Sequence, residues 1–144
     1  MMIKRLRDLR EDNELTQREL AEVLNVDRST YGGWEIAKDT IPLIKLNQVA
    51  NYYNVSMDYL LGLSDIKSYN FINKEIDITI VASRLKQFRE NNNLLQKDFV
   101  ELLNTTSSTY SAYESGKVLI STSSIYAIAN KYKGSVDWLL GRID

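Results

Sequence analysis

Apolar residues recur at helical spacing along the first 62 residues, and polar turn signals interrupt them. Leu6 and Leu9 lie three positions apart within residues 3–13, which predicts an amphipathic helix there. Leu20 and Leu24, four positions apart, predict a second helix with a buried face. Further helices are expected over residues 28–35, from about residue 42, and over residues 57–61.

Helix-start signals divide these segments. Thr16 stands three residues before Glu19, which is the spacing of a capping box. Asp27 and Ser56 are suited to cap the third and fifth helices, because their side chains can accept backbone N–H groups. Pro42 is favoured at a first helical position, and Gly62 is suited to end the fifth helix.

The chain is an internal repeat. When it is shifted by 79 positions, residues 3–62 align without a gap on residues 82–141, and 24 of the 60 pairs are identical. A match of this density predicts two copies of one fold. We therefore expect a first domain over residues 1–62, a linker over 63–79 and a second domain over 80–144.

The second copy keeps this plan with local changes. Asp77 and Thr106 are expected to cap the helices that correspond to the first and third. Leu95 replaces Thr16, so the second helix of this copy has lost its capping hydroxyl. Gly116 gives the turn after the third helix a glycine where the first copy has Ala37.

Two segments carry a family resemblance. Residues 15–21, 25–30 and 34–35 together resemble the helix-turn-helix domains of phage repressors and Cro, also found in xenobiotic-response-element-like regulators. Residues 96–117 resemble a more divergent member. The resemblance implies an all-α fold of two tandem five-helix, lambda-repressor-like domains. It also implies a sequence-specific regulator of transcription, expected to be a repressor, that binds double-stranded DNA.

In this family the third helix enters the major groove and the second crosses the phosphate backbone. The resemblance places Gln17 and Gln96 against phosphates at a helix N-terminus, where the helix dipole favours an anion. Thr16 and Lys97 lie beside them. The alternative is that both glutamines are solvated polar residues of a first helical turn.

The base-reading positions of the first copy are Asp27, Arg28, Ser29, Gly32 and Gly33. Arg28 is the sharpest candidate, because its planar fork matches guanine O6 and N7. A phosphate contact, or an ion pair with Asp27 or Glu22, is the alternative. The two glycines cost about 1 kcal/mol each relative to alanine within a helix. They indicate either that the backbone of this helix approaches DNA closely, or that the sequence has drifted in a copy that discriminates bases weakly.

The second copy carries no long charged or amide side chain at the equivalent positions. They are Thr106, Ser107, Ser108, Ser111 and Ala112. Hydroxyls and methyl groups discriminate bases less sharply. This copy is therefore expected to discriminate bases more weakly, to bind only the DNA backbone, or to mediate dimerisation.

Lys38 and Lys117 follow the third helix of each copy, where a lysine can reach a phosphate or remain solvated. Several aromatic side chains are spaced three apart on the third helices, which favours core packing over base stacking. They are Tyr31, Trp34, Tyr110 and Tyr113.

Composition narrows the function. The chain has no cysteine and no histidine, which removes thiolate chemistry, the commonest general base and the commonest zinc ligand. We expect no enzyme activity, no cofactor and no metal. No apolar run approaches the roughly 20 residues of a membrane span, so we expect a cytoplasmic protein without membrane contact.

The net charge of −1 counts mildly against a nucleic-acid binder. Residues 1–62 carry 8 basic and 10 acidic side chains, and residues 81–144 carry 8 basic and 6 acidic. Phosphate affinity must therefore come from local patches. The main rival hypothesis is a protein-interaction or antitoxin-like module, in which one or both copies no longer read DNA and bind a regulatory protein instead.

The linker is too apolar for a free tether and is expected to dock in part. Fully extended it spans roughly 55 Å, at about 3.3 Å per residue, so its release would let both copies reach one face of a duplex. The two third helices differ, and a homodimer is expected to restore the symmetry of a palindromic site.

Overall fold

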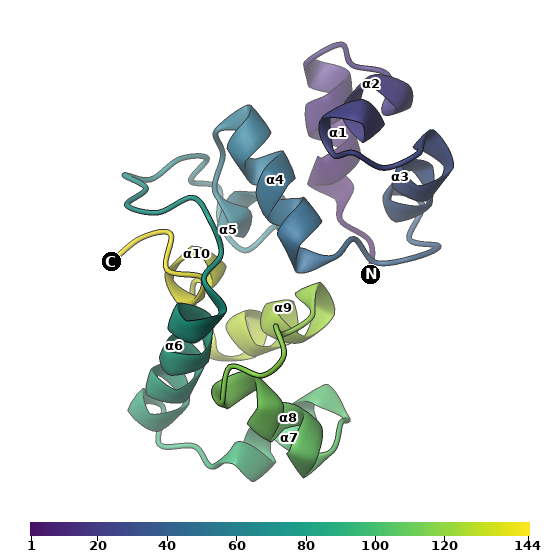
Figure 1. The fold of residues 1–144 in the computed structure, drawn as a ribbon. Coiled ribbons are helices and arrows are strands. Elements are labelled where there is room, and N and C mark those ends of the chain that lie inside the picture. The colour runs from purple at the N-terminus through teal and green to yellow at the C-terminus, as the bar shows by residue number, and fades with distance from the viewer. The chain divides into compact units, whose positions relative to one another are not determined.

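The computed structural model describes all 144 residues and contains helices and connecting loops only (Figure 1). The chain forms two compact units, Met1–Tyr69 and Asn70–Asp144. The first unit holds α1 (Lys4–Asp12), α2 (Gln17–Val23), α3 (Arg28–Glu35), α4 (Leu43–Tyr53) and α5 (Met57–Leu60). The second holds α6 (Ile78–Asn91), α7 (Gln96–Leu103), α8 (Ser107–Glu114), α9 (Thr122–Tyr132) and α10 (Val136–Leu139). The all-α fold of two five-helix units is confirmed.

Side chains cap five of the helices as predicted. The Thr16 hydroxyl accepts the Glu19 backbone N–H at 3.1 Å, and the Glu19 carboxylate accepts the Thr16 N–H at 3.1 Å. Asp27, Ser56, Asp77 and Thr106 each accept a backbone N–H in the first turn of their helices. These bonds satisfy donors that have no partner within the helix.

Two helix starts differ in detail from the prediction. Leu95 provides no capping oxygen, but the Asp98 carboxylate accepts the Leu95 N–H at 2.8 Å, so half of the capping box persists in α7. Pro42 is the N-cap residue of α4 and lies in extended backbone, and the helix begins at Leu43. A proline fits there because its missing N–H leaves no donor unsatisfied.

The aromatic residues of α3 and α8 face inward. Tyr31, Trp34 and Tyr110 are buried, and Tyr113 is half-buried. The rings of Tyr31 and Trp34 meet edge to face with centroids 6.0 Å apart, a favoured aromatic geometry. The core role predicted for these side chains is confirmed for the three buried residues.

The segment between the domains is anchored to both units. The division falls after Tyr69, inside the predicted linker 63–79, and α6 begins at Ile78. On the first unit, the Ser56 N–H donates to the Lys67 carbonyl at 2.6 Å. On the second unit, the N–H of Ile72 donates to a carbonyl near the C-terminus, at 2.9 Å. The predicted linker is therefore docked in part, with residue 67 bonded within the first unit and residue 72 bonded within the second.

An arginine on the first helix of each unit holds that unit's last helix. The Arg5 guanidinium donates to the Tyr59 carbonyl at 2.7 Å and lies 4.0 Å from the centre of the Tyr59 ring. Arg84 donates to the Trp138 carbonyl at 2.6 Å and lies 4.8 Å from the centre of that ring. Each contact joins a charged hydrogen bond to a cation–π interaction.

Ala37 occupies a backbone conformation that favours glycine. Its φ is 59°, whereas Gly116 holds the equivalent turn of the second unit at φ 76°. A residue with a side chain destabilises the folded state by about 1–2 kcal/mol in this region. Glycine avoids this strain but lowers the stability by about 0.4–1 kcal/mol, because it makes the unfolded chain more flexible. We therefore expect Ala37→Gly to stabilise the first unit by about 0.5–1 kcal/mol in urea unfolding. Gly116→Ala is the reciprocal control and should destabilise the second unit, and an unchanged midpoint in both would contradict this account.

Candidate nucleic-acid interface

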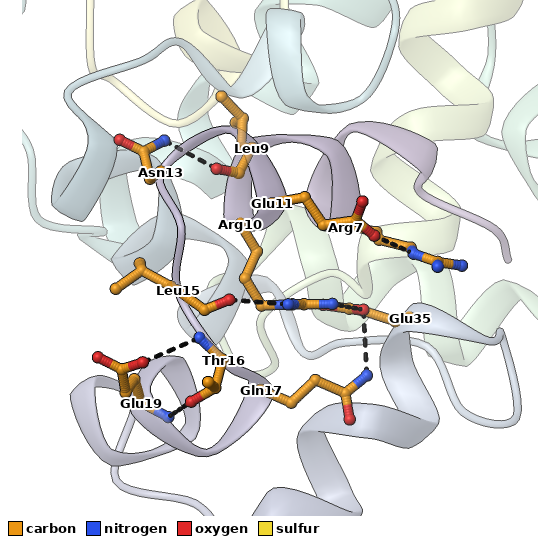
Figure 2. Close-up of polar contacts among 10 residues, drawn as sticks. All are labelled: Arg7, Leu9, Arg10, Glu11, Asn13, Leu15, Thr16, Gln17, Glu19 and Glu35. Atoms are coloured by element: carbon orange, nitrogen blue, oxygen red, sulfur yellow. Dashed lines mark hydrogen bonds and ion pairs between the residues drawn. The ribbon is translucent and has the colours of Figure 1, made fainter.

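A buried ion pair joins α1 to the end of α3 in the first unit. The Arg10 guanidinium donates from Nε to Glu35 Oε2 at 2.7 Å and from Nη2 to Glu35 Oε1 at 3.0 Å. Its Nη1 donates to the Leu15 carbonyl at 2.8 Å (Figure 2). The side chains of Arg10 and Glu35 are 12% and 2% exposed. One guanidinium therefore fixes α1, the loop before α2 and the end of α3 together.

Gln17 belongs to the same network. Its Nε2 donates to Glu35 Oε1 at 3.2 Å, so the carboxamide at the first position of α2 has a fixed orientation (Figure 2). Gly32 lies directly against it, since a Cβ at residue 32 would stand 3.1 Å from Gln17 Oε1. The group nearest to the absent side chain of residue 32 is therefore the flexible end of Gln17, and the equivalent residue of the second unit is Ser111. The second N–H of the carboxamide remains able to donate to a ligand.

The second unit repeats this network. Arg89 donates to the two oxygens of Glu114 at 2.8 and 3.0 Å, and to the Leu94 carbonyl at 3.0 Å. Gln96 Nε2 donates to Glu114 Oε1 at 3.3 Å. In each unit, the same network holds the start of the second helix (α2 or α7) beside the third helix (α3 or α8). Local sequence pattern predicts this role for neither arginine and neither glutamate.

The network keeps both glutamates ionised. Burial alone would raise the pKa of Glu35, but the interactions with Arg10, Tyr31 and Gln17, of which that with Arg10 is the largest, outweigh it and hold the pKa below its usual range. The pKa of Glu114 is lowered in the same way, chiefly by the hydrogen bond from Arg89 against the effect of burial. Each glutamate is therefore ionised at neutral pH and accepts a hydrogen bond from its neighbouring glutamine.

The N-terminal half of α3 carries the exposed candidates of the first unit. Asp27, Arg28 and Ser29 are all exposed. The Asp27 carboxylate accepts the Thr30 N–H at 2.7 Å, and this bond lowers the pKa of Asp27. The structure contains no ion pair between Arg28 and Asp27 or Glu22, so the Arg28 guanidinium is available to a ligand.

The two glycines of α3 occupy different environments. Gly33 is buried, and a Cβ there would lie 3.8 Å from Lys38 Cβ, an ordinary contact distance. Gly32 is half-buried against Gln17. Lys38 is exposed, and its aliphatic stem lies beside Gly33. The structure therefore places Lys38 at the position where a side chain of residue 33 would emerge.

The second unit presents hydroxyl groups on the corresponding helix. Thr106, Ser107, Ser108, Thr109 and Ser111 are exposed along the N-terminal half of α8. The Thr106 hydroxyl donates to Thr109 Oγ1 at 2.9 Å and lies 3.3 Å from Ser108 Oγ. This face carries no formal charge. Ala112 is half-buried. Of the other candidates, Gln17 and Gln96 are half-buried, and Thr16, Lys97 and Lys117 are exposed.

Comparisons with known proteins agree with this geometry. A helix-turn-helix family model matches residues 6–60, and a helix-turn-helix domain model matches residues 82–144. The chain is 39% identical over 90 residues to the uncharacterized HTH-type transcriptional regulator YobD of Bacillus subtilis (strain 168), covering 62% of this chain and 72% of that protein. It is also 39% identical over 83 residues to the HTH-type transcriptional regulator ImmR of the same strain. That match covers 54% of this chain and 63% of ImmR.

No solved structure matches the chain significantly. The chain belongs to the helix-turn-helix family of transcriptional regulators, which bind DNA and are not enzymes. None of its helices combines the length and apolar character needed to cross a membrane.

Proposed function

We propose that the protein is a repressor that binds specific sequences of double-stranded DNA, with α3 of the first unit in the major groove. The observation that carries this proposal is the exposed Arg28 on the first turn of α3, which has no ion-pair partner. An arginine in this position can donate two parallel hydrogen bonds to guanine O6 and N7. Ser29 beside it can donate to a base or a phosphate.

Gln17 supports the same docking. It lies at the start of α2, where the helix dipole favours an anion, and Glu35 holds one of its N–H groups at 3.2 Å. The other N–H can bond a backbone phosphate in a predetermined orientation. A phosphate contact of this kind sets the position of α3 on the duplex without itself selecting a sequence.

The second unit is proposed to dock in the same way with weaker discrimination. Gln96 is held by Glu114 as Gln17 is by Glu35. The hydroxyls on the exposed face of α8 can bond bases and phosphates, but they lack the bidentate geometry that distinguishes one base pair from another. The first unit therefore supplies most of the sequence preference.

Arg28→Ala tests base reading. In a selection of bound duplexes from a random pool, the wild-type protein should enrich a defined motif. The variant should lose roughly 1–3 kcal/mol of affinity and relax the preference at one guanine. Lys67→Ala removes the same charge from the segment after α5 and serves as the control, with an unchanged motif expected. A reporter gene placed downstream of the selected sequence should then be transcribed less when the wild-type protein is present.

An identical motif from Arg28→Ala would show that α3 does not read bases through this residue. Failure of the wild-type protein to enrich any sequence would instead favour the protein-interaction hypothesis, for which the uncharged face of α8 is the relevant surface. The homodimer and the regulatory protein partner stay predictions, and the mass of the protein in solution tests the first of them.

A further inference from the structure

The turn after α3 folds back over Gly33 in the first unit. The backbone N–H groups of Lys38 and Asp39 both donate to the Gly33 carbonyl, at 2.9 and 3.4 Å. A Cβ at residue 33 would stand 3.8 Å from Lys38 Cβ and 3.9 Å from Lys38 Cδ, and it would also stand 3.9 Å from Asp39 Oδ2. The side chains of residues 38 and 39 therefore border the space that a side chain of residue 33 would occupy.

The same place is a base-reading position of the third helix. The family resemblance assigns residue 33 to that role, but a glycine has no side chain with which to contact a base. Lys38 and Asp39 are both exposed. The structure contains no ion pair between the Lys38 ammonium and the Asp39 carboxylate, although the two residues are adjacent in the chain. A hydrogen-bond donor and a hydrogen-bond acceptor thus lie next to Gly33, and each is available to a ligand.

The carboxylate of Asp39 restricts which ligand fits. A negative charge on this face repels the phosphates of every duplex, unless the carboxylate accepts a hydrogen bond from a base. In the major groove, a G·C base pair presents the guanine acceptors O6 and N7 beside the cytosine N4–H donor. Lysine is suited to the first of these groups and aspartate to the second. The two side chains together therefore match the two edges of one G·C pair.

The second unit has the same turn without the carboxylate. The N–H groups of Lys117 and Val118 donate to the Ala112 carbonyl at 3.0 and 3.3 Å, as their counterparts do to Gly33. Lys117 retains the cation of Lys38, but Val118 stands where the first unit has its acid, and its side chain is 52% exposed. The chain therefore contains a natural comparison, in which one turn presents a donor and an acceptor and the other presents the donor alone.

We propose that Lys38 and Asp39 together read one G·C base pair, with the Lys38 ammonium donating to guanine and the Asp39 carboxylate accepting from cytosine N4. This inference rests on the proposed docking of α3 in the major groove. Residues 28 and 33 are five positions apart, which is about 7.5 Å along a helix, and successive base pairs are about 3.4 Å apart. The G·C pair should therefore lie about two base pairs from the guanine read by Arg28.

The test uses the full chain and the duplex that the wild-type protein selects, beside the same duplex with A·T in place of this G·C pair. We expect the wild-type protein to bind the G·C duplex about tenfold more tightly, and both Lys38→Met and Asp39→Val to reduce this ratio to about threefold or less. Asp39→Val should at the same time bind an unrelated duplex more tightly than the wild type does, because a charge that repels phosphates is gone.

Lys117→Met is the matched control in the second unit. It removes the same charge from the equivalent turn, so it should weaken binding to both duplexes by the same factor and leave their ratio unchanged. The three substituted residues are exposed, and an unchanged midpoint of urea unfolding verifies that each variant is folded.

A ratio that neither Lys38→Met nor Asp39→Val changes would overturn the inference. A loss by the same factor for every duplex in Lys38→Met would also overturn it, because Lys38 would then contact a phosphate only. In both cases the guanine preference that depends on Arg28 would persist, and the proposed function would stand. Failure of the wild-type protein to select any sequence would instead overturn the proposed function and this inference together.

Discussion

Arg10→Met should destabilise the first unit by about 3–5 kcal/mol at neutral pH. The substitution keeps the aliphatic stem but leaves the buried Glu35 carboxylate without its guanidinium, and breaking a buried pair from one side costs about this much. A unit of some 70 residues has a total stability on the order of 3–10 kcal/mol. Much of the first unit should therefore unfold, while the second unit is unaffected.

Each unit contains one tryptophan, Trp34 or Trp138, so fluorescence can follow one unit at a time. In a Trp138→Tyr background, urea unfolding monitored through Trp34 reports on the first unit. Arg7→Met is the control, because its pair with Glu11 is exposed and contributes little to stability. Equal losses for Arg7→Met and Arg10→Met would contradict a structural role for the buried pair.

The cost of Arg10→Met should depend on pH. Because the folded-state pKa of Glu35 is lowered, its ionised form contributes stability above the ordinary carboxyl pKa of about 4.3. That contribution is lost as the pH falls through the folded-state value. The difference between wild type and Arg10→Met should consequently shrink between pH 5 and pH 3. A difference that stays constant over this range would show that the ion pair is not its source.

Arg142→Met should have an effect of similar size in the second unit. Arg142 and Asp137 are 1% and 0% exposed, and Arg142 Nε donates to Asp137 Oδ1 at 2.9 Å. Arg142 also lies 4.7 Å from the centre of the Phe71 ring, in the segment before α6. Removal of the guanidinium leaves a fully buried carboxylate without this partner, at a cost of about 3–5 kcal/mol.

A double variant separates the charge from the packing. Asp137→Asn removes the buried negative charge, so adding it to Arg142→Met should recover part of the lost stability of the second unit, followed through Trp138 in a Trp34→Tyr background. The first unit shows that the fold does not require an arginine here. Its counterpart residue is Leu63, and the Tyr69 hydroxyl donates to the buried Asp58 at 3.2 Å. A double variant less stable than Arg142→Met would contradict the charge-based account.

Local signals were the most predictable part of this fold. The Thr16–Glu19 capping box and the Asp27 and Thr106 caps act within three residues, and the structure contains all of them. The inward direction of Tyr31 likewise follows from helical spacing. Interactions of this range depend on the backbone conformation of a single turn, which the sequence specifies directly.

The network behind Gln17 was not predictable from local pattern. Arg10 and Glu35 are 25 residues apart, and only the packing of α1 against α3 brings them together. One signal for it was present, since Arg10, Gln17 and Glu35 all recur identically 79 residues later. Three polar residues retained together across two diverged copies indicate a shared interaction.

The environment of the two glycines also needed the structure. Residues 32 and 33 were predicted at base-reading positions, with close approach to DNA and drift as the two interpretations. In the structure Gly33 is buried beside Lys38 and Gly32 lies against Gln17, and no local pattern indicates either neighbour. The hydrogen bonds of the segment between the domains could not be predicted from local pattern either. Its partners, such as Ser56 for Lys67, are fixed by tertiary packing and carry no pattern of their own.

Binding of double-stranded DNA through these two faces should be strongly weakened by salt, so the affinity for a duplex is measured at increasing salt concentration. Five exposed cations lie on or beside the helices concerned: Arg18, Arg28, Lys38, Lys97 and Lys117. Each phosphate neutralised contributes about −0.9 to the slope of log affinity against log salt concentration, so three to five contacts predict a slope of roughly −3 to −5. An affinity that does not change with salt, or no measurable binding at low salt, would contradict the account.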